Sequence, residues 1–364
     1  MFEMPRGAPS SVHLSRVMSI PLHDFAQLPL AANVAMFSAA AALIGVAGWQ
    51  LAATANRIAQ RTGLGQALTG AIFLGASTSL SGTVTSVTAA ADGHPELAFA
   101  NAIGGISAQT AFLAIADITY ARANLEHAAA SVANIMQGAL LVVMLGLILA
   151  GMSAPEVSIL GMHPISFVLP LAYVYGLRQV SRAQMEPMWR PQRTAETRED
   201  RPASERSYGG MVKLWSGFAL LSLAVALAGW VIAKTGVVIA QGTGLSETGV
   251  GAIFSAVSTS LPELVTCIAA VRQGALTLAV SDIIGGNVFD TLFVSLSDAA
   301  YRDGSILHAA GSRGTFATAL PVLLTGVMLM GLVRREKRGI ANIGFESFFV
   351  LLLYVAGAVL MLAS

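Results

Sequence analysis

Long apolar stretches alternate with short charged ones along nearly the whole chain. Each apolar stretch holds about 20 residues, the length that a helix needs to cross roughly 30 Å of hydrocarbon. Ten such segments are expected near residues 32–56, 67–90, 97–119, 129–152, 156–177, 211–235, 248–271, 276–298, 315–333 and 342–363. This pattern predicts an all-α membrane protein with about ten transmembrane helices.

The charges between the apolar segments predict the orientation, because Lys and Arg in short loops are retained on the cytoplasmic side. Alternate loops carry the basic residues, namely Arg57, Arg61, Arg122, the stretch 178–213, Arg272 and residues 334–338. The opposite loops carry Asp92, Glu96, Glu156 and Glu247, with Arg302 and Arg313 as exceptions. We therefore expect both termini outside and the central loop inside, in a plasma or inner cell membrane.

An internal repeat relates the two halves of the chain. A shift of 181 positions aligns residues 48–131 with 229–312 without a gap, and about 35 of these 84 positions are identical. The shift spans five predicted helices, an odd number, so the second copy must enter the bilayer from the opposite side. Inverted repeats of this kind are typical of secondary transporters, which bind their substrates near the midplane where the repeats meet.

The repeat predicts four regions. An N-terminal tail at 1–31 precedes a first repeat at 32–177, and an Arg-rich cytoplasmic linker at 178–210 leads to a second repeat at 211–364. The tail is expected to be mobile or interfacial, because it lacks the compact apolar region of a signal peptide. The linker is rich in Arg, Glu, Pro and Ser, a composition that cannot bury a core.

Composition excludes several classes of protein. The chain is 55% hydrophobic and 11% charged, far from the balance of a soluble domain. Its net charge of +1 and scattered arginines give no reason to expect a nucleic-acid partner. The single Cys267 excludes a disulfide within the chain. We expect a transporter rather than an enzyme, with no cofactor and with the lipid bilayer and inorganic cations as partners; the oligomeric state is left open.

The most polar residues inside the spans lie in the matched segments. Glu263 and Asp282 are carboxylates at membrane depth, where each costs about 2.5 to 3.5 kcal/mol unless it is compensated. Thr259 and Ser260 precede Glu263 by four and three residues, so their oxygens share its helix face. Oxygen ligands favour hard cations such as Na⁺ and Ca²⁺. A bound cation is therefore the natural partner of these acids.

The paired motifs resemble the two alpha-repeats of the calcium/cation antiporter superfamily, which includes the sodium/calcium exchangers. That family reads G-T-S-L-P-E and G-N-x-I-G-S-N where this chain reads STSLPE at 258–263 and SDIIGGN at 281–287. The resemblance implies a sodium/calcium exchanger-like fold and antiport of Ca²⁺ or a similar cation against Na⁺ or H⁺ by alternating access. The cation ligands that it implies are Glu263, Asp282, Thr259, Ser260, Thr78, Ser79 and Asn101, with Asp290 and Asn287 as further candidates.

The first repeat departs from the family pattern at its acidic position. Ser81 and Gly82 stand where the family has Pro-Glu, so the mate of Glu263 has no side chain. Two formal charges remain unless Asp290 adds a third, and we expect weaker Ca²⁺ binding than in the sodium/calcium members. Two alternatives follow: an antiporter of a monovalent cation (Na⁺ or Li⁺) and protons, and a non-transporting membrane scaffold or sensor, which should not need Glu263.

Two further matched pairs are interpreted as structural. Asp117 and Asp298 lie at span ends, where we expect them to cap and anchor helices at the interface. His127 and His308 follow in the next loops and are expected to be solvated.

Overall fold

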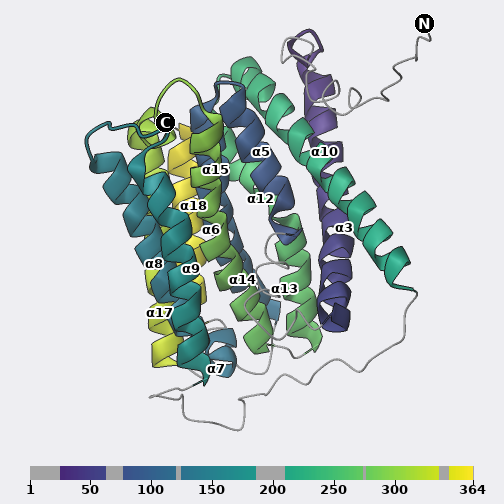
Figure 1. Ribbon diagram of the computed structural model, residues 1–364, viewed down its shortest axis with the longest axis vertical. Coiled ribbons are helices and arrows are strands. Elements are labelled where there is room, and N and C mark those ends of the chain that lie inside the picture. The colour runs from purple at the N-terminus through teal and green to yellow at the C-terminus, as the bar shows by residue number, and fades with distance from the viewer. Residues whose placement is uncertain are drawn as a thin grey trace, which may run out of the picture.

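The computed structural model describes residues 25–62, 77–119, 124–185, 210–273, 276–335 and 344–363. Within these ranges the chain is helical, and its extended pairing amounts to one isolated bridge between Ile159 and Met162. The long helices lie side by side, with their connections at the two ends of the bundle (Figure 1). The prediction of an all-α fold is confirmed.

The helices of the two halves are arranged in the same order. The first half contains α3 (Leu30–Thr62), α5 (Leu80–Ala91), α6 (Pro95–Thr119), α7 (Leu125–Ala129), α8 (Val132–Ser153) and α9 (Pro164–Met185). The second half contains α10 (Met211–Thr243), α11 (Glu247–Gly249), the π-helix η2 (Val250–Ser255), α12 (Ala256–Thr259), α13 (Leu261–Gln273), α14 (Leu276–Asp290), α15 (Leu292–Ala300), α16 (Ile306–Ala309), α17 (Gly311–Arg334) and α18 (Phe345–Ala363).

Seven helices in the described ranges are long and apolar enough to cross a membrane, or eight if the bent pair 247–259 and 261–272 forms one span. Much of the predicted span at 67–90 lies outside the described residues, which resume at Ser77. The predicted span at 156–177 differs from the structure, where α9 begins only at Pro164 and continues to Met185. The preceding residues form the Ile159–Met162 turn, so they are unavailable to the helix.

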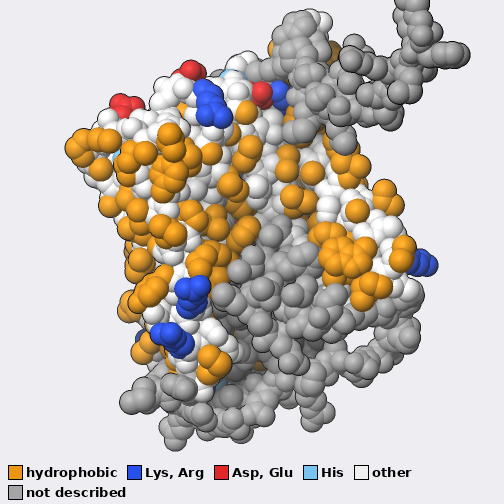
Figure 2. Space-filling view, viewed as in Figure 1, with side chains coloured by type: hydrophobic (Ala, Val, Ile, Leu, Met, Phe, Trp, Pro, Cys, Tyr) orange, Lys and Arg blue, Asp and Glu red, His pale blue; other side chains and the backbone are white. Residues whose placement is uncertain are grey.

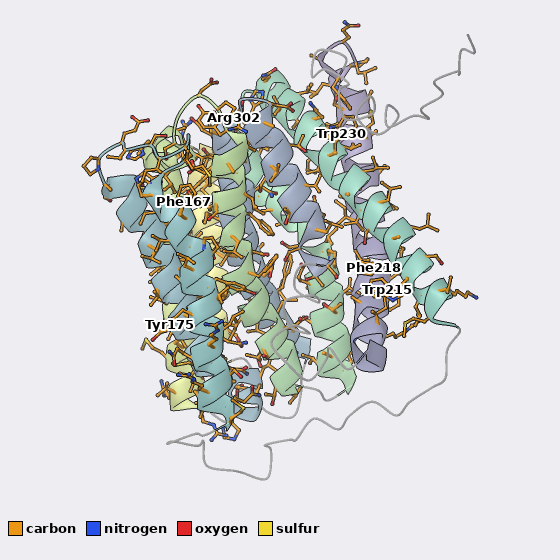
Figure 3. The ribbon with its side chains drawn as sticks, viewed as in Figure 1. Phe167, Tyr175, Trp215, Phe218, Trp230 and Arg302 are labelled. Carbon is orange, nitrogen blue, oxygen red and sulfur yellow. The ribbon has the colours of Figure 1, made fainter. Side chains whose placement is uncertain are left out.

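Charge differs between the two ends of the bundle. One end, called the acidic end below, carries Asp92, Glu96, Glu156, Glu247 and Asp303, and the other, the basic end, carries Arg57, Arg178, Arg272 and Arg334. Apolar side chains are spread over the coloured part of the face between them, and acidic side chains lie at one edge beside Lys or Arg side chains (Figure 2). Trp215 and Phe218 lie near the basic end of α10, and Arg302 lies at the acidic end (Figure 3). Which side of the membrane each end faces stays a prediction.

Helix α6 forms the centre of the bundle. Of the 18 consecutive residues that make up its most apolar part, 94% are buried inside the protein. The corresponding shares are 28% for α3 and 33% for α10. Close packing against η2 requires glycine, because a Cβ on Gly104 would lie 2.4 Å from the carbonyl oxygen of Ala252. The polar residues of α6 are therefore held away from lipid.

Packing between the halves repeats at the offset of 181. A Cβ on Gly48 of α3 would meet the Pro262 ring of α13, and a Cβ on Gly229 of α10 would meet the carbonyl oxygen of Ser81 on α5 at 2.6 Å. Gly48 matches Gly229 and Ser81 matches Pro262, so these contacts are symmetry mates. The first helix of each repeat thus packs against the second helix of the other.

Two buried aspartates join the repeats in the same reciprocal way. Asp298 accepts hydrogen bonds from the backbone N–H of Ile306 at 2.8 Å and of His163 at 2.7 Å. Its mate Asp117 accepts them from the matched positions, Leu125 at 2.6 Å and Gly344 at 3.5 Å. Each aspartate therefore holds the start of the other repeat's last helix, as expected for a cap, although both lie fully buried.

The matched histidines are also structural contacts between the repeats. His308 Nε2 lies 2.8 Å from the carbonyl oxygen of Ala154, and His127 Nδ1 lies 2.7 Å from that of Arg335. Ala154 and Arg335 are themselves mates at the offset of 181. The expectation that both histidines are solvated is wrong for His127, which is buried, because each ring binds the end of a helix from the other repeat.

One ion pair breaks the symmetry. Lys234 Nζ on α10 lies 2.7 Å from Asp92 Oδ2 beyond the C-terminus of α5, and Lys234 is buried. The matched positions in the other half are Ala53 and Gln273, which cannot form an ion pair. The contact therefore ties α10 to α5 at the acidic end alone.

Replacing one partner of this pair should destabilise the protein. We expect Lys234→Met to lower the free energy of unfolding by about 1 to 3 kcal/mol, because Asp92 is left partly buried without its countercharge. Thermal unfolding in detergent measures the change. The double variant Lys234→Met with Asp92→Asn should recover most of the loss, and equal melting temperatures for all variants would contradict a stabilising pair.

Candidate functional site

Two matched helix breaks lie at the site. Ser79 and its mate Ser260 leave helical geometry with nearly the same backbone angles, φ −83° and ψ 7° for Ser79 and φ −97° and ψ 9° for Ser260. The second break bends the chain by 47° just before Pro262, whose missing N–H weakens the helix there. Asp290 lies at the C-terminus of α14, and Thr291, whose backbone angles stay helical at φ −58° and ψ −24°, leads into α15 within one span at 279–300.

A small cavity lies where these breaks meet α6. About 10 Å³ is open to the centre of a water-sized sphere, close to the space that one water molecule needs. Its walls combine both repeats: Ser79, Gly82, Asn101, Gly105, Gln109, Thr259, Ser260, Glu263, Asp290 and Phe293. The cavity can therefore hold a single small ion, without its hydration shell.

A hydrogen-bond network around Asp290 lies at the centre. Gln109 Nε2 donates to Asp290 Oδ2 at 2.7 Å and to Ser260 Oγ at 3.3 Å, and Ser79 Oγ donates to Asp290 Oδ1 at 2.6 Å. Gln109 and Asp290 are mates at the offset of 181, and so are Ser79 and Ser260. The pseudo-two-fold axis consequently passes through the bond between Gln109 and Asp290.

The wall nearest α5 is held by Asn101. Its Nδ2 donates to the Gly82 carbonyl oxygen at 3.2 Å and to Ser86 Oγ at 2.9 Å. Its Oδ1 accepts a hydrogen bond from Thr259 Oγ1 at 3.4 Å. These contacts fix the amide with its oxygen toward the second repeat.

Two oxygens in the walls lack donors. Glu263 Oε2 and Gln109 Oε1 are buried and have no hydrogen-bond partner among the described residues. Glu263 does receive a hydrogen bond from the Thr78 side chain. Buried acceptors without donors are unfavourable in an apolar surrounding, and a bound cation is a partner that such oxygens accept.

The donor set determines which cations fit. Carboxylate, hydroxyl and amide oxygens suit hard cations such as Na⁺ and Ca²⁺. The described residues contain no group of three or more His, Cys, Asp or Glu placed to hold a metal ion. The cavity therefore offers two carboxylates, Glu263 and Asp290, and several neutral oxygens.

The structure brings most of the residues predicted from the sequence to this cavity. Ser79, Asn101, Thr259, Ser260 and Glu263 line it, and so does Asp290. Thr78 is outside the cavity walls, and its side chain donates a hydrogen bond to Glu263.

Two of the predicted residues lie elsewhere. Asn287 Nδ2 donates to Thr110 Oγ1 at 3.1 Å and is outside the cavity walls. Asp282 is partly exposed and also outside them. It precedes Asp290 by eight residues, which is about 12 Å along a helix, too far for both acids to bind one ion.

Gln109 and Phe293 are the wall residues that sequence reasoning missed. Gln109 could have been found as the repeat mate of Asp290. Phe293 left no such signal, because an aromatic residue inside a span is ordinary. Its ring closes the space beside Gly82, where a Cβ would lie 2.9 Å from Phe293 Cε2.

These features define a polytopic membrane protein of inverted-repeat architecture, with a polar cavity where the repeats meet. Three solved structures share the fold. An H⁺/Ca²⁺ exchanger, CAX, superposes with a TM-score of 0.65 at 12% identity, covering 96% of this chain and 88% of that one. The sodium-calcium exchanger NCX_Mj gives 0.59 at 17% identity over 91% and 99%, and native YfkE gives 0.63 at 16% identity over 94% and 96%.

The sequence model described as "Sodium/calcium exchanger protein" matches residues 32–177 and 213–363, and the chain belongs to this family. Inner membrane protein YrbG of Escherichia coli (strain K12) is 32% identical over 137 residues, 38% of this chain and 42% of that protein. Sodium/calcium exchanger MaX1 of Methanosarcina acetivorans is 27% identical over 158 residues, 42% of this chain and 44% of that protein. The chain thus spans less than half the length of these curated relatives.

The Phe293 ring leaves little space for an acidic side chain at position 82. We expect Gly82→Glu alone to lower the free energy of unfolding by about 1 to 3 kcal/mol, because its Cβ and carboxylate must displace the Phe293 ring. Combined with Phe293→Leu, the same change should be tolerated and should strengthen Ca²⁺ binding. Thermal unfolding and calorimetric Ca²⁺ titration in detergent measure both effects.

Phe293→Leu alone is the matched control. Unfolding energies that simply add in the double variant would show that the two positions do not compete for space.

Proposed function

We propose that this protein is a secondary antiporter that moves Ca²⁺ or a similar cation against Na⁺ or H⁺ by alternating access. The observation that carries the proposal is the unpartnered Glu263 oxygen in a cation-sized cavity beside a second carboxylate, Asp290. Family membership supports it, since the matching family is described as sodium/calcium exchangers.

In this proposal Glu263 and Asp290 are the acids for which the exchanged ions compete. A divalent cation between them would be neutralised by their two charges. Asn101, Gln109, Ser79, Thr259 and Ser260 would complete its shell with neutral oxygens. Because one small cavity cannot hold both substrates, the two ions would bind in turn, which couples their opposite movements.

The Gln109 amide would bind the same Asp290 oxygen as the cation, so the two would compete for it. It donates to Asp290 Oδ2 at 2.7 Å, so Asp290 is not left as an unpaired charge. An arriving cation would take over that oxygen and could also reach Gln109 Oε1, which has no partner among the described residues. A rotation of one amide would then exchange a donor for an acceptor.

A monovalent cation/proton antiporter is the second candidate function. It is favoured by one observation: both acids in the cavity wall come from the second repeat, and the first repeat supplies Gly82, Asn101 and Gln109 at the matched positions of Glu263, Asp282 and Asp290. Fewer charges around an ion lower Ca²⁺ affinity more than Na⁺ affinity.

Ion flux in reconstituted vesicles tests both candidates. We expect Ca²⁺ uptake driven by an outward Na⁺ or H⁺ gradient, and at least a roughly tenfold loss in Glu263→Gln and in Asp290→Asn, since each removes half of the cavity's charge. Flux of Na⁺ or Li⁺ against protons, with no Ca²⁺ uptake, would select the second candidate.

Asp303→Asn is the matched control, because Asp303 is an exposed acid at the acidic end and outside the cavity. It should transport like the unmodified protein. Unimpaired flux in Glu263→Gln would refute the assigned site, and the absence of any gradient-driven flux in the unmodified protein would refute the proposed function.

A further inference from the structure

One apolar side chain stands in the otherwise polar wall of the cavity. Among the wall residues that the structure describes, Phe293 is the one whose side chain offers no oxygen and yet fills space. It is the second residue of α15, and only 3% of it is exposed. A cation in the cavity therefore meets oxygens in most of the wall and an aromatic ring in one part of it.

This ring fills the place that an acid of the first repeat would need. A Cβ on Gly82 would lie 2.9 Å from Phe293 Cε2 and 3.7 Å from Cζ, and Gly82 is the repeat mate of Glu263. One repeat thus supplies a carboxylate at this position, and the other supplies a space that the ring occupies. Because the ring takes up this space, it helps to limit the cavity to about the room of one water molecule.

Two further rings hold Phe293 in place. Phe289 contacts it edge to face, with centroids 6.1 Å apart and planes at 86°. Tyr173 of α9 contacts Phe289 in the same way, at 6.0 Å and 70°. Such pairs are favourable because the positive edge of one ring meets the negative face of the other. The ring in the cavity wall is therefore braced against α9.

The first repeat does not reproduce this aromatic brace. The mate of Phe293 is Phe112, which is also buried but lies outside the cavity walls. The mate of Phe289 is Ala108, whose methyl group cannot link two rings. The wall is thus stiffened by aromatic contacts from the second repeat, and Phe112 provides a matched comparison.

We propose that Phe293 makes this antiporter select cations by size, so that it accepts Ca²⁺ and excludes larger divalent cations such as Ba²⁺. The inference rests on the proposed antiport function and deepens it by naming a residue that determines selectivity. Selectivity among hard cations depends on cavity size, ligand number and flexibility. A larger ion needs longer distances to the wall oxygens, and therefore more room than the braced ring leaves. Forcing it against a stiff wall is overpacking, which weakens its binding.

Phe289 and Tyr173 are positioning residues in this inference, because they lie outside the cavity walls and act through the Phe293 ring. Phe289→Leu removes the brace without changing the chemistry of the wall, so it should weaken the selection by size. Tyr173→Phe keeps the aromatic contact and should keep the selection.

Competition between divalent cations tests the inference. Radioactive Ca²⁺ uptake into reconstituted vesicles is measured while unlabelled Ca²⁺, Sr²⁺ or Ba²⁺ is added outside, and the concentrations that halve the uptake are compared. In the unmodified protein Ba²⁺ should require roughly ten times the concentration of Ca²⁺, with Sr²⁺ between them. Phe293→Leu should lower this ratio to about threefold or less, because leucine leaves more room.

Phe112→Leu is the matched control, since it makes the same change at the repeat mate outside the cavity walls. It should keep the ratio of the unmodified protein. The ratio is independent of the amount of active protein, so partial misfolding of a variant does not alter it.

The outcomes separate this inference from the proposed function. Equal inhibition by Ca²⁺ and Ba²⁺ in the unmodified protein, an unchanged ratio in Phe293→Leu, or the same drop in Phe112→Leu would overturn the role of Phe293 and leave the antiport function in place. An unmodified protein without gradient-driven Ca²⁺ uptake would remove Ca²⁺ antiport, and this inference would fail with it.

Discussion

A hydrogen bond between two residues that are each other's repeat mates joins the halves of this protein at their common axis. On the axis the first repeat contributes the neutral Gln109 and the second contributes the charged Asp290, which lie 2.7 Å apart. Two ionised carboxylates at that distance would repel each other strongly in a medium of low dielectric constant. An amide opposite an acid instead allows a hydrogen bond between them, so the symmetry of the fold is broken at its axis.

The architecture was well predicted from the sequence, because both of its signals are long. Apolar segments of about 20 residues and a gapless repeat of 84 positions leave few other folds. The predicted helix ends differ from the structure where local backbone geometry determines them. The turn at Ile159 and Met162 delays α9, and the breaks at Ser79 and Ser260 interrupt segments that hydropathy treats as continuous.

The site could be predicted only in part, because some of its residues are far apart in the sequence and meet only in the folded protein. The family motif led to Glu263, Thr259 and Ser260, and the repeat then led to Ser79 and Asn101. The family motif also pointed to Asp282, which lies outside the cavity walls and about 12 Å of helical rise from Asp290. Gln109 and Phe293 reach the cavity through the crossing of α6 and α15 with the broken helices, and a linear pattern does not contain that crossing.

The reciprocal caps set by Asp117 and Asp298 have a consequence for biosynthesis. The backbone N–H of His163 is satisfied by a carboxylate that follows it by 135 residues, so this part of the chain emerges from the ribosome long before its partner exists. Until then the backbone N–H of His163, at the start of α9, lacks the carboxylate that accepts its hydrogen bond in the complete fold. Backbone groups of a membrane protein need such partners within the protein. Translation of the second half therefore completes the first, and a chain severed in the central linker would have to reunite its fragments before either could mature.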